Sequence, residues 1–160
     1  MSESKQELYP DSMAFEQWEY NGNICYLLHT EMGHNCGYVR FPKRPVKVAG
    51  YDGILDYVPV HGGITYAHND EAGMVYGFDC AHYNDEHNPL VRDPEWLKRE
   101  CQNMADGILL AAKFEDRYLR AEGDNEQRAA ILAEYEAELG INIDVADNFG
   151  VMLNVLFGSL

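Results

Sequence analysis

Positive charge is scarce in this chain. Its 160 residues include 12 Lys and Arg against 27 Asp and Glu, which gives a formal net charge of −15. Binding to a nucleic-acid polymer depends on neutralising its phosphates with an excess of Lys and Arg. The composition therefore argues against general binding to DNA or RNA.

The sequence also lacks long apolar runs and the cysteine spacing of a zinc finger. No segment is apolar for long enough to be expected to span a bilayer, and the start, MSESKQE, is too polar for a signal peptide. We therefore expect a cytoplasmic protein without a membrane partner. The four cysteines form no CxxC pair, so we expect neither a zinc finger nor a disulfide framework, and we expect Cys80 and Cys101 to be buried.

Acidic residues are absent between positions 32 and 51, where Arg40, Lys43, Arg44 and Lys47 gather. A local basic loop on an acidic protein suits a small anionic ligand. We expect Arg40, with Lys43 or Arg44, to neutralise the charge of a phosphate. A solvated loop that offsets acidic neighbours is the alternative.

The front half of the chain has the composition of an antiparallel sheet with four or five strands. A turn-rich segment, residues 68–73, lies between two apolar stretches and predicts a hairpin. The strand candidates are residues 24–29, 36–41, 64–67 and 74–79, preceded by residues 1–20 as an arm that docks by its aromatic side chains.

The back half changes to helical periodicity. Asp93 followed by Pro94 is typical of a helix start, and the apolar spacing carries that helix to about Arg120. A second helix is expected over 126–139, closed by Gly140. These features predict an α+β fold, with a small antiparallel sheet first and helices after.

The chain shows no linker or repeat that would divide it, so we expect a single domain over 1–160. Its end, residues 145–156, is apolar at helical spacing and predicts a last helix packed on the body or on a partner. A homodimer is one arrangement that this tail favours.

Two polar motifs stand within the predicted strands, VHGGITY over 60–66 and GFDCAHYND over 77–85. If the hairpin pairs as expected, His61 lies opposite Asp79. Two imidazoles and two carboxylates would then meet at one place. Stability alone does not require such a cluster, which is why we expect the functional site there.

The first motif sets His61 beside Gly62 and Gly63. Glycines let a backbone approach a ligand, so we expect their amides to hold an oxyanion or a phosphate, with His61 as general base or metal ligand. Thr65 would share a strand face with His61 and join the ligand site. A tight turn that needs glycine, with His61 satisfied in the core, is the alternative.

The second motif places Asp79, His82 and Asp85 at three-residue spacing. With His61 they form a set of two nitrogen and two oxygen donors, which suits zinc or manganese. Without a metal, His61 and His82 would be acid/base groups oriented by Asp79 and Asp85. The remaining alternative is that Asp79 caps a turn and that His82 bonds to it.

Other polar residues are expected to lie away from this site. His68 and His87 are assigned to exposed loops, and His29 and His34 to a distant hairpin. Glu100, beside two basic residues on the predicted helix, is expected at the surface; the alternative is that it reaches back to the site as a base.

The motifs resemble those of a family of small, mostly uncharacterised proteins common in bacteriophage and plasmid genomes. That family has a C-G-Y-V strand, then V-H-G-G-x-T-[FY], then G-F-D-C-A-H-x-x-D. The matching segments here are 36–39, 60–66 and 77–85, so the resemblance covers roughly 18–112 and leaves 113–160 as a helical C-terminal extension. The resemblance implies a phage accessory protein that acts in the cytoplasm of the host bacterium and is of the kind that often counters host defence.

Three functions remain open from the sequence. The first is a hydrolase acting on a small nucleotide or another phosphorylated molecule. The second is a protein that binds and sequesters such a molecule without turnover. The third is an acidic inhibitor of a host protein.

Overall fold

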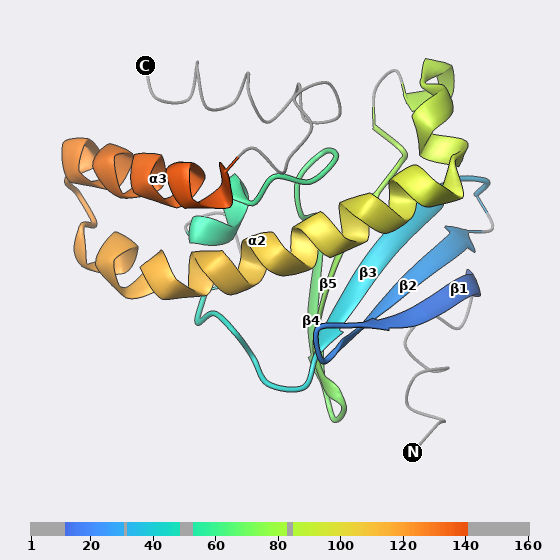
Figure 1. Ribbon diagram of the computed structural model, residues 1–160, viewed down its shortest axis with the longest axis horizontal. Helices are drawn as coiled ribbons and strands as arrows, with labels where there is room; N and C mark the ends of the chain where they lie inside the picture. Colours follow the sequence, from blue (N-terminus) through green and yellow to red (C-terminus); the bar gives the residue numbers. More distant parts are fainter. Residues whose placement is uncertain (1–11, 31, 49–52, 83–84, 141–160) are drawn as a thin grey trace.

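The computed structural model describes residues 12–30, 32–48, 53–82 and 85–140, which form an antiparallel five-stranded sheet and two long helices (Figure 1). This confirms the predicted α+β fold. The strands are β1 (Ser12–Tyr20), β2 (Asn23–Thr30), β3 (Asn35–Phe41), β4 (Tyr66–Asp70) and β5 (Gly73–Asp79), in the spatial order β1-β2-β3-β5-β4. The helices are α2 (Pro94–Arg120) and α3 (Asn125–Leu139), and three short 3-10 turns are η1 (Ile54–Tyr57), η2 (Asp85–His87) and η3 (Pro89–Arg92).

Residues 12–20 correct the expectation of a docking arm. They form the edge strand β1, which pairs along its length with β2. The aromatic side chains do help to hold it, because Trp18 Nε1 donates to Gln102 on α2 at 3.1 Å. Backbone pairing with β2 thus makes this segment a strand. The composition of the segment alone did not reveal the strand, because strand formation depends on the neighbour with which it pairs.

The predicted hairpin exists as β4 and β5, with a tighter turn than expected. Asp70 pairs directly with Gly73, and the pairing at the open end stops where Thr65 N donates to Gly77 O at 2.9 Å. His61 therefore lies outside the strand. The expectation that His61, Gly63 and Thr65 share one strand face was wrong, because the side-chain alternation of a strand does not extend to residues 60–64.

The helix boundaries follow the predicted signals. Asp93 caps α2 by accepting from Glu95 N at 3.0 Å, and Pro94 occupies the first turn, where its missing N–H leaves no bond unmade. Gly140 ends α3 with a φ of +70°. The predicted helix over 145–156 lies outside the described residues.

The apolar face of α2 packs on one face of the sheet and builds a single large core that also takes in α3. The position between 112 and 113, where the resemblance ends, falls inside α2. Phe114 and Tyr118, beyond it, belong to the same core. A second, smaller cluster of buried side chains, which includes Tyr26, Leu28 and Val75, lies on the other face of the sheet.

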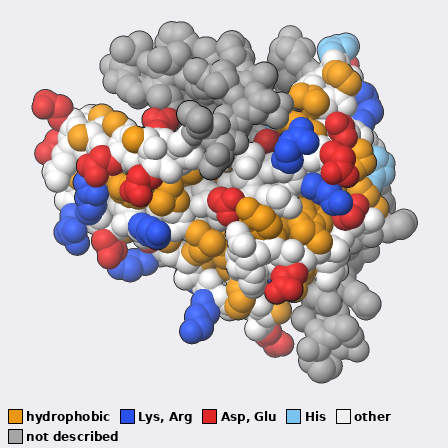
Figure 2. Space-filling view, in the orientation of Figure 1, with side chains coloured by type: hydrophobic (Ala, Val, Ile, Leu, Met, Phe, Trp, Pro, Cys, Tyr) orange, Lys and Arg blue, Asp and Glu red, His pale blue; other side chains and the backbone are white. Residues whose placement is uncertain are grey.

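The surface shows no separate basic region on the face drawn in Figure 2, where blue and red side chains are interspersed over the helices. Among the described residues, no helix combines the length and the apolar character that a membrane crossing requires.

Candidate functional site

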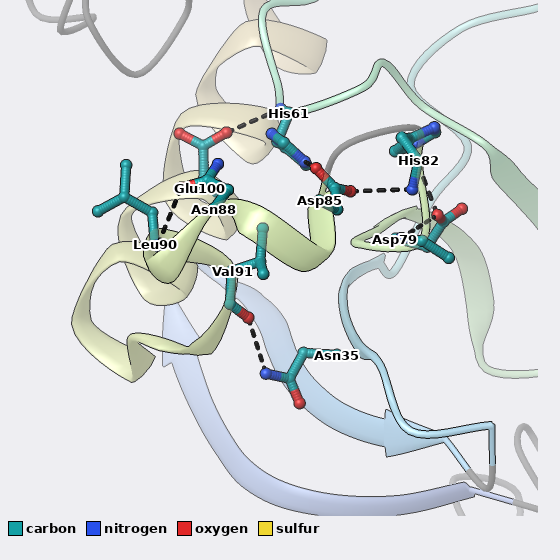
Figure 3. Close-up of polar contacts among 10 residues, drawn as sticks. Asn35, His61, Asp79, His82, Asp85, Asn88, Leu90, Val91 and Glu100 are labelled. Atoms are coloured by element: carbon teal, nitrogen blue, oxygen red, sulfur yellow. Dashed lines mark hydrogen bonds and ion pairs between the residues drawn. The ribbon is translucent and has the colours of Figure 1, made fainter.

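The predicted site residues meet at one end of the sheet. Asp79 ends β5 and pairs with Cys36 at the start of β3, so both lie at this end. Two segments outside the sheet reach the same place, the turn that contains His61 and the turn η2 that begins with Asp85 (Figure 3). We call the connected residues Glu100, His61, Asp85, His82 and Asp79 the His61–His82 network.

The centre of the network is a histidine–carboxylate pair. His61 Nε2 lies 2.9 Å from Asp85 Oδ1, and the two side chains are 17% and 8% exposed. An ionised carboxylate only accepts hydrogen bonds, so Nε2 carries the proton in this contact. In the neutral ring, Nδ1 then keeps its lone pair and is the nitrogen able to accept a proton.

Asp85 is fixed by its own turn. Its Oδ2 accepts from His82 N at 2.9 Å, while its backbone N donates to His82 O at 2.9 Å. The three-residue spacing between His82 and Asp85 thus closes a tight turn rather than a helical face. Because both carboxylate oxygens are engaged, the side chain presents one fixed orientation to the His61 ring.

The second imidazole lies beside the first. The ring centroids of His61 and His82 are 5.9 Å apart. His82 Nε2 is buried 3.4 Å from Asp79 Oδ1, and the contact has an ion-pair distance without the geometry of a hydrogen bond. Since the His82 side chain is 34% exposed, its exposed part is not Nε2. The structure therefore brings together two imidazoles, each next to a carboxylate.

Asp79 is held in the ionised form. Its Oδ1 accepts from Ala81 N at 3.0 Å and its Oδ2 from the Thr65 hydroxyl at 2.9 Å. Burial opposes ionisation of this carboxyl, but the two hydrogen bonds and the nearby His82 and His34 outweigh burial and lower its pKa below the usual 3.8. The structure therefore contains the turn cap expected as the alternative role of Asp79, and Thr65 supports Asp79.

Gly62 and Gly63 form a tight turn with φ angles of +70° and +83°. Gly63 N donates to Val60 O at 2.9 Å, so this amide is not available to hold an oxyanion. A Cβ built on Gly62 would overlap the His82 ring at Nε2. Glycine is thus required at position 62 both by its backbone and by the close approach of the His82 ring.

Two residues of α2 support His61 from behind. Glu100 Oε1 accepts from His61 N at 2.8 Å, and the Trp96 ring lies edge-on to the His61 ring with centroids 5.3 Å apart. Glu100 is 1% exposed, so the expected surface position was wrong. The neighbouring Lys98 and Arg99 suggested a solvated helix face. Glu100 lies four residues from both Trp96 and Met104, however, and this spacing on the apolar face of the helix was the signal that predicted burial.

The basic residues lie at the other end of the sheet. Arg40 pairs across the sheet with Val75 and lies four positions along β3 from Cys36, a distance of about 13 Å. Its guanidinium is buried and donates to Asp70 Oδ1 at 2.6 Å and to the Tyr26 hydroxyl at 3.3 Å. The exposed residues Lys43 and Arg44 follow the same strand end. The structure thus does not place Arg40, Lys43 and Arg44 with His61 and His82.

One histidine was wrongly assigned to a distant place. His34, in the turn between β2 and β3, lies near enough to Asp79 to lower its pKa. The sequence could not show this proximity, because it depends on the pairing of β3 with β5. His68 and His87 are exposed, as predicted, but His68 lies in strand β4 and not in a loop, because the hairpin turn is tighter than expected.

The nearby thiols are poor candidates for a nucleophile. Cys36 and Cys80 are 3% and 5% exposed, and both are unpaired. Burial raises the pKa of Cys36 to about 11 and also raises the pKa of Cys80. Because the thiolate is the reactive form, these cysteines are inert at neutral pH. Cys80 and Cys101 are buried, as predicted.

Three of the four residues expected as metal ligands, His61, Asp79 and Asp85, are engaged with the protein itself. His61 Nε2 contacts Asp85, the second Asp85 oxygen binds His82 N, and both Asp79 oxygens accept hydrogen bonds. Within 12–30, 32–48, 53–82 and 85–140, no group of three or more His, Cys, Asp or Glu side chains could hold a metal ion. Zinc or manganese at this site stays a prediction from the sequence.

No protein-family model matches the chain, and no curated protein or solved structure matches it either. The resemblance to phage and plasmid proteins accordingly stays a prediction, and the function has to be inferred from the site.

Proposed function

We propose that the protein is a hydrolase that uses the His61–Asp85 pair as a general acid/base on a small nucleotide or another small phosphorylated molecule. The observation that carries this proposal is the buried Asp85 carboxylate behind a partly exposed imidazole, at 2.9 Å. A carboxylate in this position selects the tautomer of the ring and stabilises the imidazolium that forms when the ring takes a proton.

The second histidine supports a two-group mechanism. The rings of His61 and His82 lie edge-on to each other with centroids 5.9 Å apart, close enough for both to contact the oxygens of one phosphate group. His61 Nδ1 would take a proton from an attacking water, and a protonated His82 would deliver one to the departing oxygen. Imidazolium charge would then stabilise the phosphate, since Arg40 is held elsewhere by Asp70.

The family resemblance adds a setting to this proposal. In a phage accessory protein, such an activity would destroy a nucleotide signal in the host bacterium.

A non-catalytic binding protein is the second candidate, and one observation favours it. Asp85 and Glu100 both accept hydrogen bonds from backbone N–H groups of the histidines. Carboxylates used in this way build a fixed binding surface whether or not a reaction follows.

One experiment separates the two functions. The full-length protein would be assayed with bis(p-nitrophenyl) phosphate and with a panel of cyclic and linear nucleotides, beside His61→Gln and His82→Gln. Exposed His87, which lies 3.7 Å from the exposed Glu86, provides the matched control His87→Gln. We expect multiple turnovers, reduced about 10²- to 10⁴-fold in the two site variants and unchanged in the control. Stoichiometric retention of an intact nucleotide without product would establish the binding function instead.

A further inference from the structure

α2 contacts His61 at two points that the proposed acid/base chemistry does not use. Glu100 Oε1 accepts from His61 N at 2.8 Å, and one helical turn earlier the Trp96 ring meets the His61 ring edge-on at an interplanar angle of 78°. Glu100 and Trp96 are each 1% exposed. Both side chains are thus shielded from solvent, and both contact His61.

The turn that carries His61 needs such support. Its backbone continues into Gly62 and Gly63, which have the widest conformational choice of any residue, and a hydrogen bond between Gly63 N and Val60 O closes it. A displacement of His61 by about 1 Å would break the contact with Asp85, because hydrogen bonds lengthened to that extent lose their strength. The position of the His61 main chain therefore decides whether the pair forms.

Burying a carboxylate such as that of Glu100 costs free energy of folding. Ionised groups lose much hydration on burial, and an apolar side chain of similar size packs there with less penalty. A carboxylate accepting from an N–H group, however, makes a shorter and stronger bond than a neutral acceptor does. The presence of Glu100 on the core face of α2 is explained if the bond to His61 N has to be strong.

We propose that Glu100 is the positioning residue of the site and fixes the His61 main chain so that the ring meets Asp85. Its catalytic meaning rests on the function proposed above. The positioning itself is a property of the folded protein and can be measured without any substrate.

The same helix supplies a matched comparison. Glu115 is 3% exposed and accepts from Lys47 N at 2.8 and 2.9 Å and from Val48 N at 3.0 Å. It also uses a buried carboxylate to hold loop amides, but it holds the segment that follows β3, away from the histidines. Glu115 thus has the same structural role as Glu100 without a neighbouring site.

The test is ¹⁵N NMR of the full-length protein with Glu100→Met, Glu100→Gln and Glu115→Met. The signals to follow are the His61 amide and the two His61 ring nitrogens, whose shifts report the tautomer and the bond to Asp85. We expect Glu100→Met to move all three, Glu115→Met to leave them unchanged, and Glu100→Gln, which keeps a weaker acceptor, to move them less than Glu100→Met does. Unchanged His61 ring signals in Glu100→Met, or equal changes in Glu115→Met, would overturn the proposal.

If Glu100→Met does not fold, Glu100→Gln decides the question. Replacing a charged acceptor by a neutral one weakens the bond, so the His61 amide proton is expected to move upfield. An amide proton that stays in place would show that Glu100 does not hold His61 N.

The kinetic consequence separates this inference from the proposed function. If the protein turns over a phosphodiester, Glu100→Met should lower kcat about 100-fold with little change in KM, and Glu115→Met should leave kcat unchanged. A wild-type protein without turnover would overturn the hydrolase and leave the NMR result standing. An unchanged kcat in Glu100→Met would overturn the positioning role and leave the hydrolase standing.

Discussion

Asp85 lies between two segments and binds both, the ring of His61 with one oxygen and the backbone N of His82 with the other, each at 2.9 Å. One buried carboxylate thereby sets the geometry of both histidines. The amide of an asparagine could accept only one of these bonds and would turn its NH₂ toward the other donor.

Asp85→Asn is therefore expected to damage both the site and the fold. An unsatisfied buried donor reduces the free energy of unfolding by about 1–3 kcal/mol, measured by urea denaturation. Under the proposed function, kcat/KM for bis(p-nitrophenyl) phosphate should fall about 10²- to 10⁴-fold. Asp116→Asn is the control, because Asp116 is 64% exposed and pairs with the exposed Lys47. Full activity in Asp85→Asn would remove the pair from the mechanism.

Alanine at positions 62 and 63 separates backbone strain from contact with His82. Both glycines have positive φ, so alanine destabilises either turn position by about 1–2 kcal/mol. At Gly62 the new Cβ would also meet the His82 ring, whereas at Gly63 no atom lies within 4 Å. We expect Gly62→Ala to shift the His82 ring signals in NMR and Gly63→Ala to leave them in place. Equal shifts in the two variants would show that the ring does not pack on Gly62.

Arg40→Met tests whether this residue serves stability or ligand binding. Removing the buried guanidinium leaves Asp70 without its ion-pair partner, and breaking a buried pair typically lowers the free energy of unfolding by about 3–5 kcal/mol. Because the Asp70 side chain is 21% exposed, we expect a smaller decrease of about 2–3 kcal/mol, measured by urea denaturation. The His61 ring signals should not change. Lys43→Met, at an exposed position, should change neither quantity. A loss of nucleotide binding in Arg40→Met at unchanged stability would contradict this role.

Asp79 makes stability depend on pH in the acid range. Its pKa is lower in the folded protein than its usual 3.8, so between these two values the unfolded chain binds more protons and the free energy of unfolding rises with pH. The contribution is complete above about pH 5 and is lost as the pH falls through the folded pKa. We expect urea denaturation between pH 3 and 5 to show a steeper dependence for the wild type than for Asp79→Asn. The Asp70 carboxyl, whose pKa is also lowered, affects both proteins alike.

Local signals in the sequence determined much of this fold. The Asp93–Pro94 start of α2, the glycine that ends α3 and the short apolar runs of β2, β3 and β5 act over a few residues, and each of these elements lies close to where the sequence placed it. Capping and side-chain periodicity depend on neighbours along the chain, which is why they can be read without a structure.

The site was only partly determined in this way. The sequence named His61, Asp79, His82 and Asp85, and these residues do meet, but through a glycine turn and the turn η2 rather than through strand pairing. Tertiary structure alone decided that Glu100 is buried behind His61 and that Arg40 faces Asp70 at the far end of the sheet. Antiparallel register and helix docking join residues far apart in the chain. No local pattern specifies such contacts, because their energy comes from partners that the sequence does not place side by side.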